Sequence, residues 1–140
     1  APVAAYVPAV RTGDYVHTSG QLPFVGGELP ARGKAGTGPG QVSPETAQDL
    51  ARTAALNAVA AVASLVGDLD RVVRVVKVVG FVSSDPAFTG QPGVINGAST
   101  LLHEVFGEAG VHARSAVGVA VLPLDSPVEV EIVVELAPEA

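Results

Sequence analysis

The stretch of this 140-residue chain with the clearest chemical potential is residues 113–120, ARSAVGVA. If it forms a strand, one face carries a guanidinium followed by very small side chains: Arg114, Ala116, Gly118 and Ala120. Small side chains leave space, and arginine suits a carboxylate because its two parallel N–H donors match two oxygens. The pattern therefore favours a carboxylate site at Arg114. An ion pair with Glu129 or Glu131, between strands or between subunits, is the alternative.

Two glutamates near the end of the sequence could activate water. Glu129 and Glu131 alternate with valines in residues 128–135, and a carboxylate facing a cleft can deprotonate a water that attacks a C=N carbon. The same alternation is also explained by a half-buried strand whose polar face meets solvent. Both interpretations stay open at this point.

Other polar residues give weaker signals. Thr18-Ser19-Gly20-Gln21 follows an expected strand and offers backbone amides, a hydroxyl and a glycine that lets a ligand approach, although a simple turn has the same composition. Tyr6 is a phenol in a chain with few aromatic residues, where a core or interface role is the alternative. Asn57 and Asn96 fit helix capping or interface hydrogen bonds.

Metal and nucleotide chemistry receive no support from the motifs. The chain has no cysteine, and His17, His103 and His112 lack the spacing of a zinc site. The glycine-rich residues 33–40 lack the Gly-Lys-Ser/Thr ending of a phosphate-binding loop. These observations argue against metal (none is expected), thiol and nucleotide sites.

Strands and helices alternate along the chain. Ser43 can cap a free amide and Pro44 fits a first helical turn, while Gly67 ends that helix. The expected elements are strands at 6–10 and 15–19, a surface loop at 24–42, a helix from Ser43 to Gly67, a buried strand at 72–82, a loop at 83–93, a helix at 94–106, and strands at 114–122 and 128–135. This order predicts an α+β fold, a ββαβαββ mixed sheet with both helices on one face, because βαβ crossovers are short and right-handed.

Composition bounds the assembly and the partners. The length suits one domain over residues 1–140, and its core must use small aliphatic side chains because 48% of residues are hydrophobic but only 4% aromatic. The face of the sheet without helices would expose valines, so we expect other subunits to cover it. The net charge of −6 makes nucleic acid an unfavourable partner. Without a long uninterrupted apolar stretch or a leader, the expected location is cytoplasmic, with no membrane contact.

Five motifs in order resemble the RidA family, also called YjgF or L-PSP endoribonuclease-like. They are Tyr6-Val7, Thr18-Ser19-Gly20-Gln21-Leu22-Pro23, Gly80-Phe81-Val82, Ala113-Arg114-Ser115-Ala116-Val117 with Leu122-Pro123, and Val128-Glu129-Val130-Glu131. The resemblance runs nearly end to end. Residues 96–99, 104–107 and 112–115 look like a divergent branch, distinct from the best-studied deaminases.

The resemblance implies a chorismate-mutase-like homotrimer with clefts between subunits and no cofactor. Deaminases of this family hydrolyse imines and enamines such as 2-aminoacrylate to 2-keto acids and ammonia. By this resemblance, Arg114 would hold the substrate carboxylate and Glu129 would serve the attacking water. Residues expected to bind substrate are Tyr6, Ser19, Gly20, Asn96 and Ala116, the last standing where deaminases often carry a polar or sulfur-bearing residue. The alternatives are a non-catalytic trimer that binds small carboxylates, and an endoribonuclease or translation inhibitor.

Overall fold

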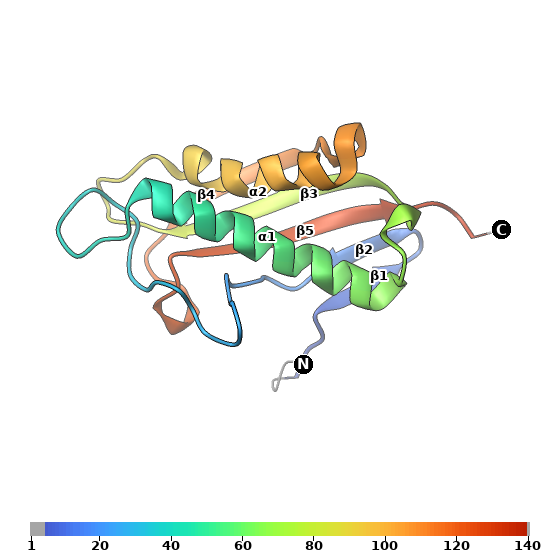
Figure 1. Ribbon diagram of the computed structural model, residues 1–140, viewed down its shortest axis with the longest axis horizontal. Coiled ribbons are helices and arrows are strands. Elements are labelled where there is room, and N and C mark those ends of the chain that lie inside the picture. The colour runs from blue at the N-terminus through green and yellow to red at the C-terminus, as the bar shows by residue number, and fades with distance from the viewer. Residues whose placement is uncertain (1–4, 140) are drawn as a thin grey trace.

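The computed structural model describes residues 5–139 and contains a five-stranded sheet and two long helices. The elements are β1 (Ala9–Thr12), β2 (Tyr15–Thr18), α1 (Pro44–Val66), η1 (Leu69–Arg71), β3 (Val72–Ser83), α2 (Gln91–Phe106), η2 (Gly107–Gly110), β4 (Ala113–Val119), η3 (Pro123–Asp125) and β5 (Val128–Leu136). The sheet order is β1-β2-β5-β3-β4, with β3 and β4 parallel and the other pairs antiparallel. Both helices cover one face (Figure 1). The predicted ββαβαββ mixed sheet is confirmed.

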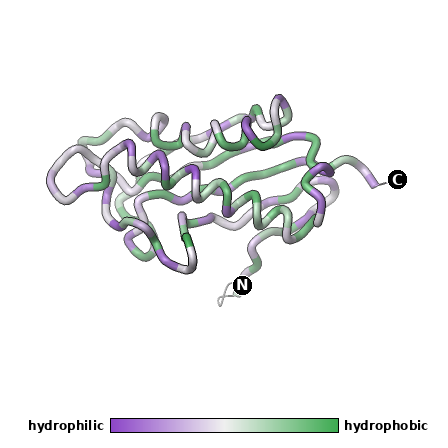
Figure 2. Tube along the Cα trace, in the orientation of Figure 1, coloured by the Kyte–Doolittle hydropathy of each residue, from purple (hydrophilic) through white to green (hydrophobic). Residues whose placement is uncertain are grey.

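The core lies between this sheet and the helices. In β5 the valines and aliphatic residues at even positions are buried and Glu129, Glu131 and Glu135 point to the other face. The buried face of α1 is mostly alanine, which brings the helix close to the strands. Apolar positions follow the strands and the inner sides of both helices (Figure 2). Strand alternation therefore divides the sheet into a helix-covered face and an open face.

α1 begins and ends where its capping residues predict. The Ser43 side chain accepts a hydrogen bond from the Thr46 amide at 3.1 Å, and Gly67 adopts a positive φ of 84° at the C-terminal cap. Among residues 5–139, it is the one helix long and apolar enough to suit a membrane span, and half of that stretch is buried inside the structure. A core helix of this composition meets the same criterion.

Three expected boundaries were wrong. β1 starts at Ala9, so Tyr6 precedes the strand and is 57% exposed. α2 starts at Gln91, three residues early, because Pro92 occupies its first turn, where a missing N–H costs nothing. β4 ends at Val119, and the chain leaves the sheet before Pro123.

The glycine-rich residues 24–42 are a loop, as predicted, but the loop is anchored to the body. Ala35 is fully buried and bridges to Val42 and Ser84. Arg32 and Lys34 donate hydrogen bonds to the carbonyls of Leu124 and Ala120. The loop thus fastens the segment that joins β4 to β5.

Two glycines allow α2 to approach its neighbours closely. A Cβ on Gly80 would lie within 3.0 Å of the Ile95 side chain, so this glycine lets α2 press against β3. A Cβ on Gly97 would lie within 3.0 Å of the backbone carbonyl oxygen of Gln48 on α1. Since backbone cannot swing away as a side chain can, Gly97 sets the spacing of the two helices.

We predict that Gly97→Ala destabilises the protein and that Gly93→Ala does not. Both glycines lie in α2, but a Cβ on Gly93 would meet nothing within 4 Å. At the open position alanine should raise the free energy of unfolding by up to about 1 kcal/mol through helix propensity. At Gly97 overpacking should lower the free energy of unfolding by about 1–3 kcal/mol. Urea unfolding of the two variants measures the difference, and equal stabilities would contradict the close helix contact.

Candidate functional site

Arg114 lies on the edge strand β4 with its side chain turned toward α2. Its Nη1 donates to Asn96 Oδ1 at 2.8 Å and to Ser99 Oγ at 3.2 Å. Both partners are neutral, and Nε and Nη2 have no hydrogen-bond partner among residues 5–139. The ion pairs among residues 5–139 involve three other arginines, Arg11, Arg52 and Arg71. Within one chain, residues 5–139 therefore contain no ion pair between Arg114 and Glu129 or Glu131. The ion pair between subunits stays an alternative.

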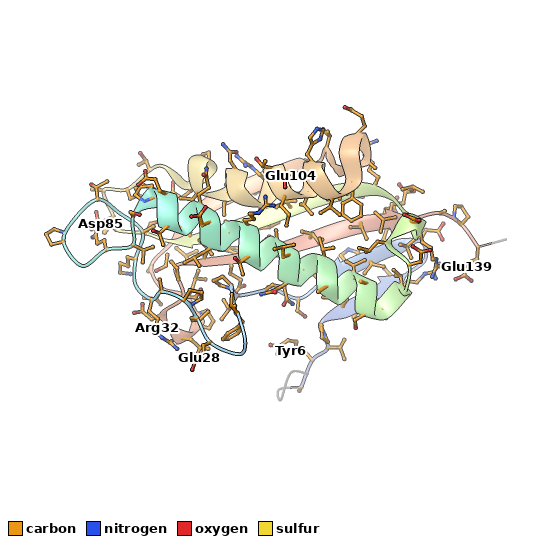
Figure 3. The ribbon with its side chains drawn as sticks, viewed as in Figure 1. Tyr6, Glu28, Arg32, Asp85, Glu104 and Glu139 are labelled. Atoms are coloured by element: carbon orange, nitrogen blue, oxygen red, sulfur yellow. The ribbon has the colours of Figure 1, made fainter. Side chains whose placement is uncertain are left out.

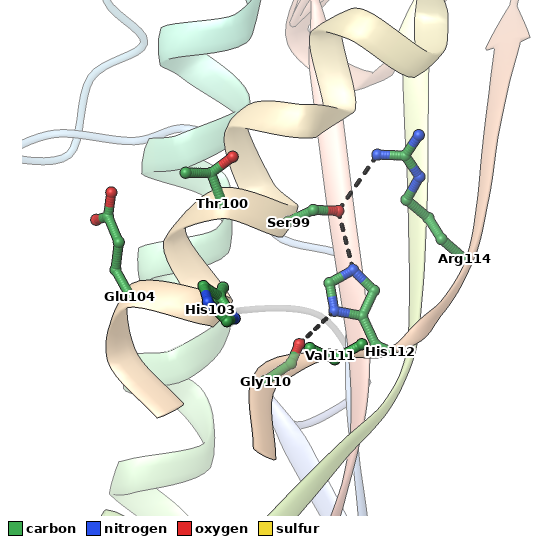
Figure 4. Close-up of a pocket in the computed structure, with 8 residues that line it drawn as sticks. All are labelled: Ser99, Thr100, His103, Glu104, Gly110, Val111, His112 and Arg114. Carbon is green, nitrogen blue, oxygen red and sulfur yellow. Dashed lines mark hydrogen bonds between the residues drawn. The ribbon is translucent and has the colours of Figure 1, made fainter. Parts of the chain in front are cut away.

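A cavity of about 470 Å³ opens beside this guanidinium. It lies between α2, η2 and the start of β4 (Figure 4) and is lined by Ser99, Thr100, His103, Glu104, Gly110, Val111, His112 and Arg114. The Nε and Nη2 edge of the guanidinium has no partner among residues 5–139, so an anion beside Arg114 could receive two parallel N–H bonds. The geometry suits recognition of a carboxylate.

Ser99 and His112 complete the surroundings of Arg114, and sequence reasoning did not single them out. His112 Nε2 lies 2.9 Å from Ser99 Oγ, and His112 Nδ1 lies 2.6 Å from the Gly110 carbonyl oxygen. A weak signal was present, because Asn96 and Ser99 are three residues apart and so share a face of α2. The contact with His112 depends on how η2 folds back, which no local pattern specifies.

Ser19, Gly20 and Glu129 form a second group at the end of β2. Ser19 Oγ donates to the Val7 carbonyl at 2.6 Å, which draws the segment after Tyr6 alongside. The Glu129 carboxylate lies over Gly20, where a Cβ would come within 3.0 Å of it. Tyr6 itself is exposed and lies near the N-terminal end of the described chain (Figure 3).

The Glu129 carboxyl is half-buried. Burial raises its pKa above the ordinary glutamate value, and the charge of Glu131 raises the pKa further. A carboxylate with a raised pKa is a stronger base than an exposed glutamate, so it suits removal of a proton from water.

The two groups do not meet within one chain. Arg114 pairs with Val78, which pairs with Ile132, so all three face the helices. Glu129 pairs with Phe81, three residues farther along β3, and faces the open side. Arg114 and Glu129 are thus on opposite faces with β3 between them.

The remaining predicted residues have other surroundings. Ala116 shares the helix-covered face with Arg114 but packs against the hydrophobic core and does not line the cavity. Asn57 caps nothing: its Nδ2 donates to the carbonyls of Leu22 and Phe24 and holds the loop. Within residues 5–139 no group of three or more histidine, aspartate or glutamate side chains could hold a metal ion.

Comparison with known proteins identifies the family. A family model described as "YjgF/chorismate_mutase-like, putative endoribonuclease" matches residues 1–136. Protein TCP17 of Trypanosoma cruzi is 48% identical over 139 residues, covering 97% of this chain and 84% of that protein.

Solved structures agree with the fold. Protein Atu1372 from Agrobacterium tumefaciens superposes with a TM-score of 0.90 at 43% identity, covering 97% of this chain and 85% of that one. E. coli TdcF, solved with bound serine, gives a TM-score of 0.67 at 27% identity, covering 97% and 91%. With a model matched over nearly the whole chain and a relative of this identity, the protein belongs to the YjgF/chorismate-mutase-like family, the RidA family that its motifs resemble.

Proposed function

We propose that this protein hydrolyses small reactive 2-imino and enamino acids to 2-keto acids and ammonia. The reaction would take place in clefts between the subunits of a homotrimer, and the protein would act in the cytoplasm. The observation that carries the proposal is the Arg114 guanidinium, which lines a cavity, which neutral acceptors hold at one nitrogen, and whose other two nitrogens have no partner among residues 5–139. A 2-imino acid has a carboxylate next to the reacting C=N carbon. Gripping that carboxylate fixes the reacting carbon at a set distance from the arginine.

The reaction needs a proton acceptor and water. In 2-iminopropanoate, water adds to the C=N carbon while Glu129 accepts its proton, and the nitrogen is protonated. The tetrahedral intermediate then loses ammonia as the C=O bond forms, so one imine and one water give one pyruvate and one ammonia. The raised pKa of Glu129 favours the first step. Ser19, Gly20 and Tyr6 would complete the wall around the water.

A neighbouring subunit would bring the two groups together. Arg114 lies on the edge strand β4 and contacts Asn96 of α2, whereas Ser19, Gly20 and Glu129 lie toward the open face. Since one chain cannot close a cleft around both, the β4 edge of one protomer would meet the open face of the next. Exposed Val10, Tyr15 and Val117 on that face favour such burial.

Binding without turnover is a second candidate. TdcF, a structural relative, was solved with bound serine, which carries a carboxylate next to a nitrogen-bearing carbon. The same arginine could hold such a ligand with no water activated. Endoribonuclease activity, which the family description names, is less well supported because the net charge of −6 repels a phosphate backbone.

We expect Arg114→Ala to abolish acceleration of keto-acid release when the protein is added to a threonine dehydratase assay. Loss of two charge-assisted hydrogen bonds should lower kcat/KM by about 100-fold or more. Arg114→Lys should restore little of it, because an ammonium cannot match two carboxylate oxygens.

Arg11→Ala is the matched control, because Arg11 is bound to Asp14 and Glu139 far from the cavity. This variant should accelerate keto-acid release like the wild type. If the wild type accelerates no imino acid while 2-oxobutanoate raises its melting temperature, the binding function replaces the catalytic one.

Glu129→Gln should lower the rate but raise stability at neutral pH. The folded-state pKa of Glu129 is above its unfolded value, so ionisation opposes folding at pH 7 and not below the ordinary glutamate pKa of about 4.3. The melting temperature should exceed the wild-type value by roughly 1–3 °C at pH 7, a small gap since the carboxyl is half exposed. Melting curves between pH 4 and 7.5 should show the gap closing on acidification. A gap that widens instead would contradict the burial of this group.

Sedimentation equilibrium should give three times the mass of one chain. Val117→Lys, which places a charge on the open face beside Phe81, should shift the protein toward monomer and lower kcat/KM at equal chain concentration. Leu65→Lys on the exposed side of α1 is the control and should leave the trimer intact. A wild-type monomer with full activity would disprove the shared cleft.

A further inference from the structure

Arg114 stands at the end of a chain of hydrogen bonds that starts at Gly110. The Gly110 carbonyl lies 2.6 Å from His112 Nδ1, His112 Nε2 lies 2.9 Å from Ser99 Oγ, and Ser99 Oγ lies 3.2 Å from Arg114 Nη1 (Figure 4). We call these residues, Gly110, His112 and Ser99, the relay. Gly110 and His112 have no part in the chemistry proposed above.

When His112 is neutral, the direction of every bond in the relay follows from its two ends. A carbonyl oxygen can only accept, so His112 Nδ1 must carry a hydrogen, and a neutral imidazole then presents Nε2 as an acceptor. A guanidinium can only donate, so Ser99 Oγ accepts from Arg114. The single hydroxyl hydrogen of Ser99 is therefore directed to His112.

The first member of the relay is fixed by packing. A Cβ on Gly110 would lie within 3.0 Å of the Leu102 carbonyl oxygen and carbon, so the backbone of η2 lies directly against α2. Gly110 is also buried. Its carbonyl is thus a rigid acceptor, and the imidazole ring that it orients is held against the same helix that carries Ser99.

Without His112, Ser99 would have a competing partner. A serine within a helix readily donates its hydroxyl hydrogen to a backbone carbonyl one turn earlier, and Ser99 lies in the middle of α2. The Nε2 acceptor draws that hydrogen away from the helix and leaves a lone pair directed at Arg114. With Asn96 taking the other hydrogen of Nη1, the Nε and Nη2 edge is left for a ligand.

We propose that His112, acting through Ser99, is a positioning residue that fixes the Arg114 guanidinium for an anionic ligand. The identity of the ligand as a small 2-keto or 2-imino carboxylate rests on the proposed function, but the relay itself does not. His112 touches neither the carboxylate nor the reacting carbon in this role.

A double-variant cycle tests the proposal, with 2-oxobutanoate as the probe and isothermal calorimetry as the measurement. Ser99→Ala and His112→Phe should each raise Kd by about tenfold, the effect of losing one hydrogen bond to a charged group. The double variant should bind no more weakly than Ser99→Ala alone, because His112 acts only through Ser99. Ser99→Thr keeps the hydroxyl and should restore most of the affinity. Effects that multiply in the double variant, or a His112→Phe variant with wild-type Kd, would overturn the proposal.

Nuclear magnetic resonance separates failure of the relay from failure of the proposed function. At pH 7.5, 15N spectra of the wild type should show His112 as the Nδ1–H tautomer, whereas a free neutral imidazole favours Nε2–H. The Arg114 guanidinium signals should be resolved in the wild type and averaged by rotation in His112→Phe. If 2-oxobutanoate does not bind but these signals behave as expected, the ligand assignment fails and the relay stands. Guanidinium signals that are unchanged in His112→Phe would overturn the relay. An Nε2–H tautomer would also overturn it, and this result does not depend on a stable variant because the tautomer is measured in the wild type.

Discussion

The arrangement of the candidate site depends on the Arg114 guanidinium, whose hydrogen-bond partners among residues 5–139 are all neutral. Asn96 and Ser99 both contact the same nitrogen of Arg114, and no carboxylate of residues 5–139 competes for the others. An arginine with a carboxylate partner would have its charge satisfied and its free edge occupied. Here the charge stays available to a ligand, while the two neutral bonds restrict the motion of the side chain. Because Arg114 is partly exposed to water, its charge keeps part of its hydration, and the desolvation cost of this arrangement is reduced.

Close packing makes those two bonds reachable. Asn96 and Ser99 belong to α2, and they meet an arginine on an edge strand only because α2 lies very near both α1 and the sheet. Glycines at the contact points, Gly80 on β3 and Gly97 on α2, remove the side chains that would hold these elements apart. Small residues thus act on the site indirectly, by setting distances between the elements that carry the polar groups.

The division of the sheet into two faces explains why Arg114 and Glu129 lie apart within one chain. Alternation along β5 sends its aliphatic residues to the helices and Glu129 to the open side, and the same alternation along β4 sends Arg114 to the helices. A strand cannot change the side of one residue without moving all the others. The open face, with its mixture of exposed aliphatic residues and glutamates, is suited to a surface that buries apolar area and still holds polar groups near its rim.

Periodicity in the sequence determined the elements and their faces. The alternation in residues 128–135, the cap at Ser43 and the stop at Gly67 are local, so the strand, the helix and the buried face could be predicted from neighbouring residues. The motifs also predict Arg114, Asn96, Ser19, Gly20 and Glu129 as site residues, and their role stays a prediction. The early start of α2 was missed because Pro92 is compatible with both a loop and a first helical turn.

What the tertiary structure alone decided is which of these residues meet. Whether Arg114 pairs with Glu129 or faces a cavity depends on the order of strands in the sheet, and sequence spacing does not specify that order. The roles of Ser99 and His112 depend on the fold of η2 against α2, over distances set by packing. The sequence by itself determined the kinds of groups and the side of each strand on which they lie, because those follow from local periodicity. The partner of each group was decided only when distant segments packed together, because hydrogen bonds require contacts between atoms that the chain separates.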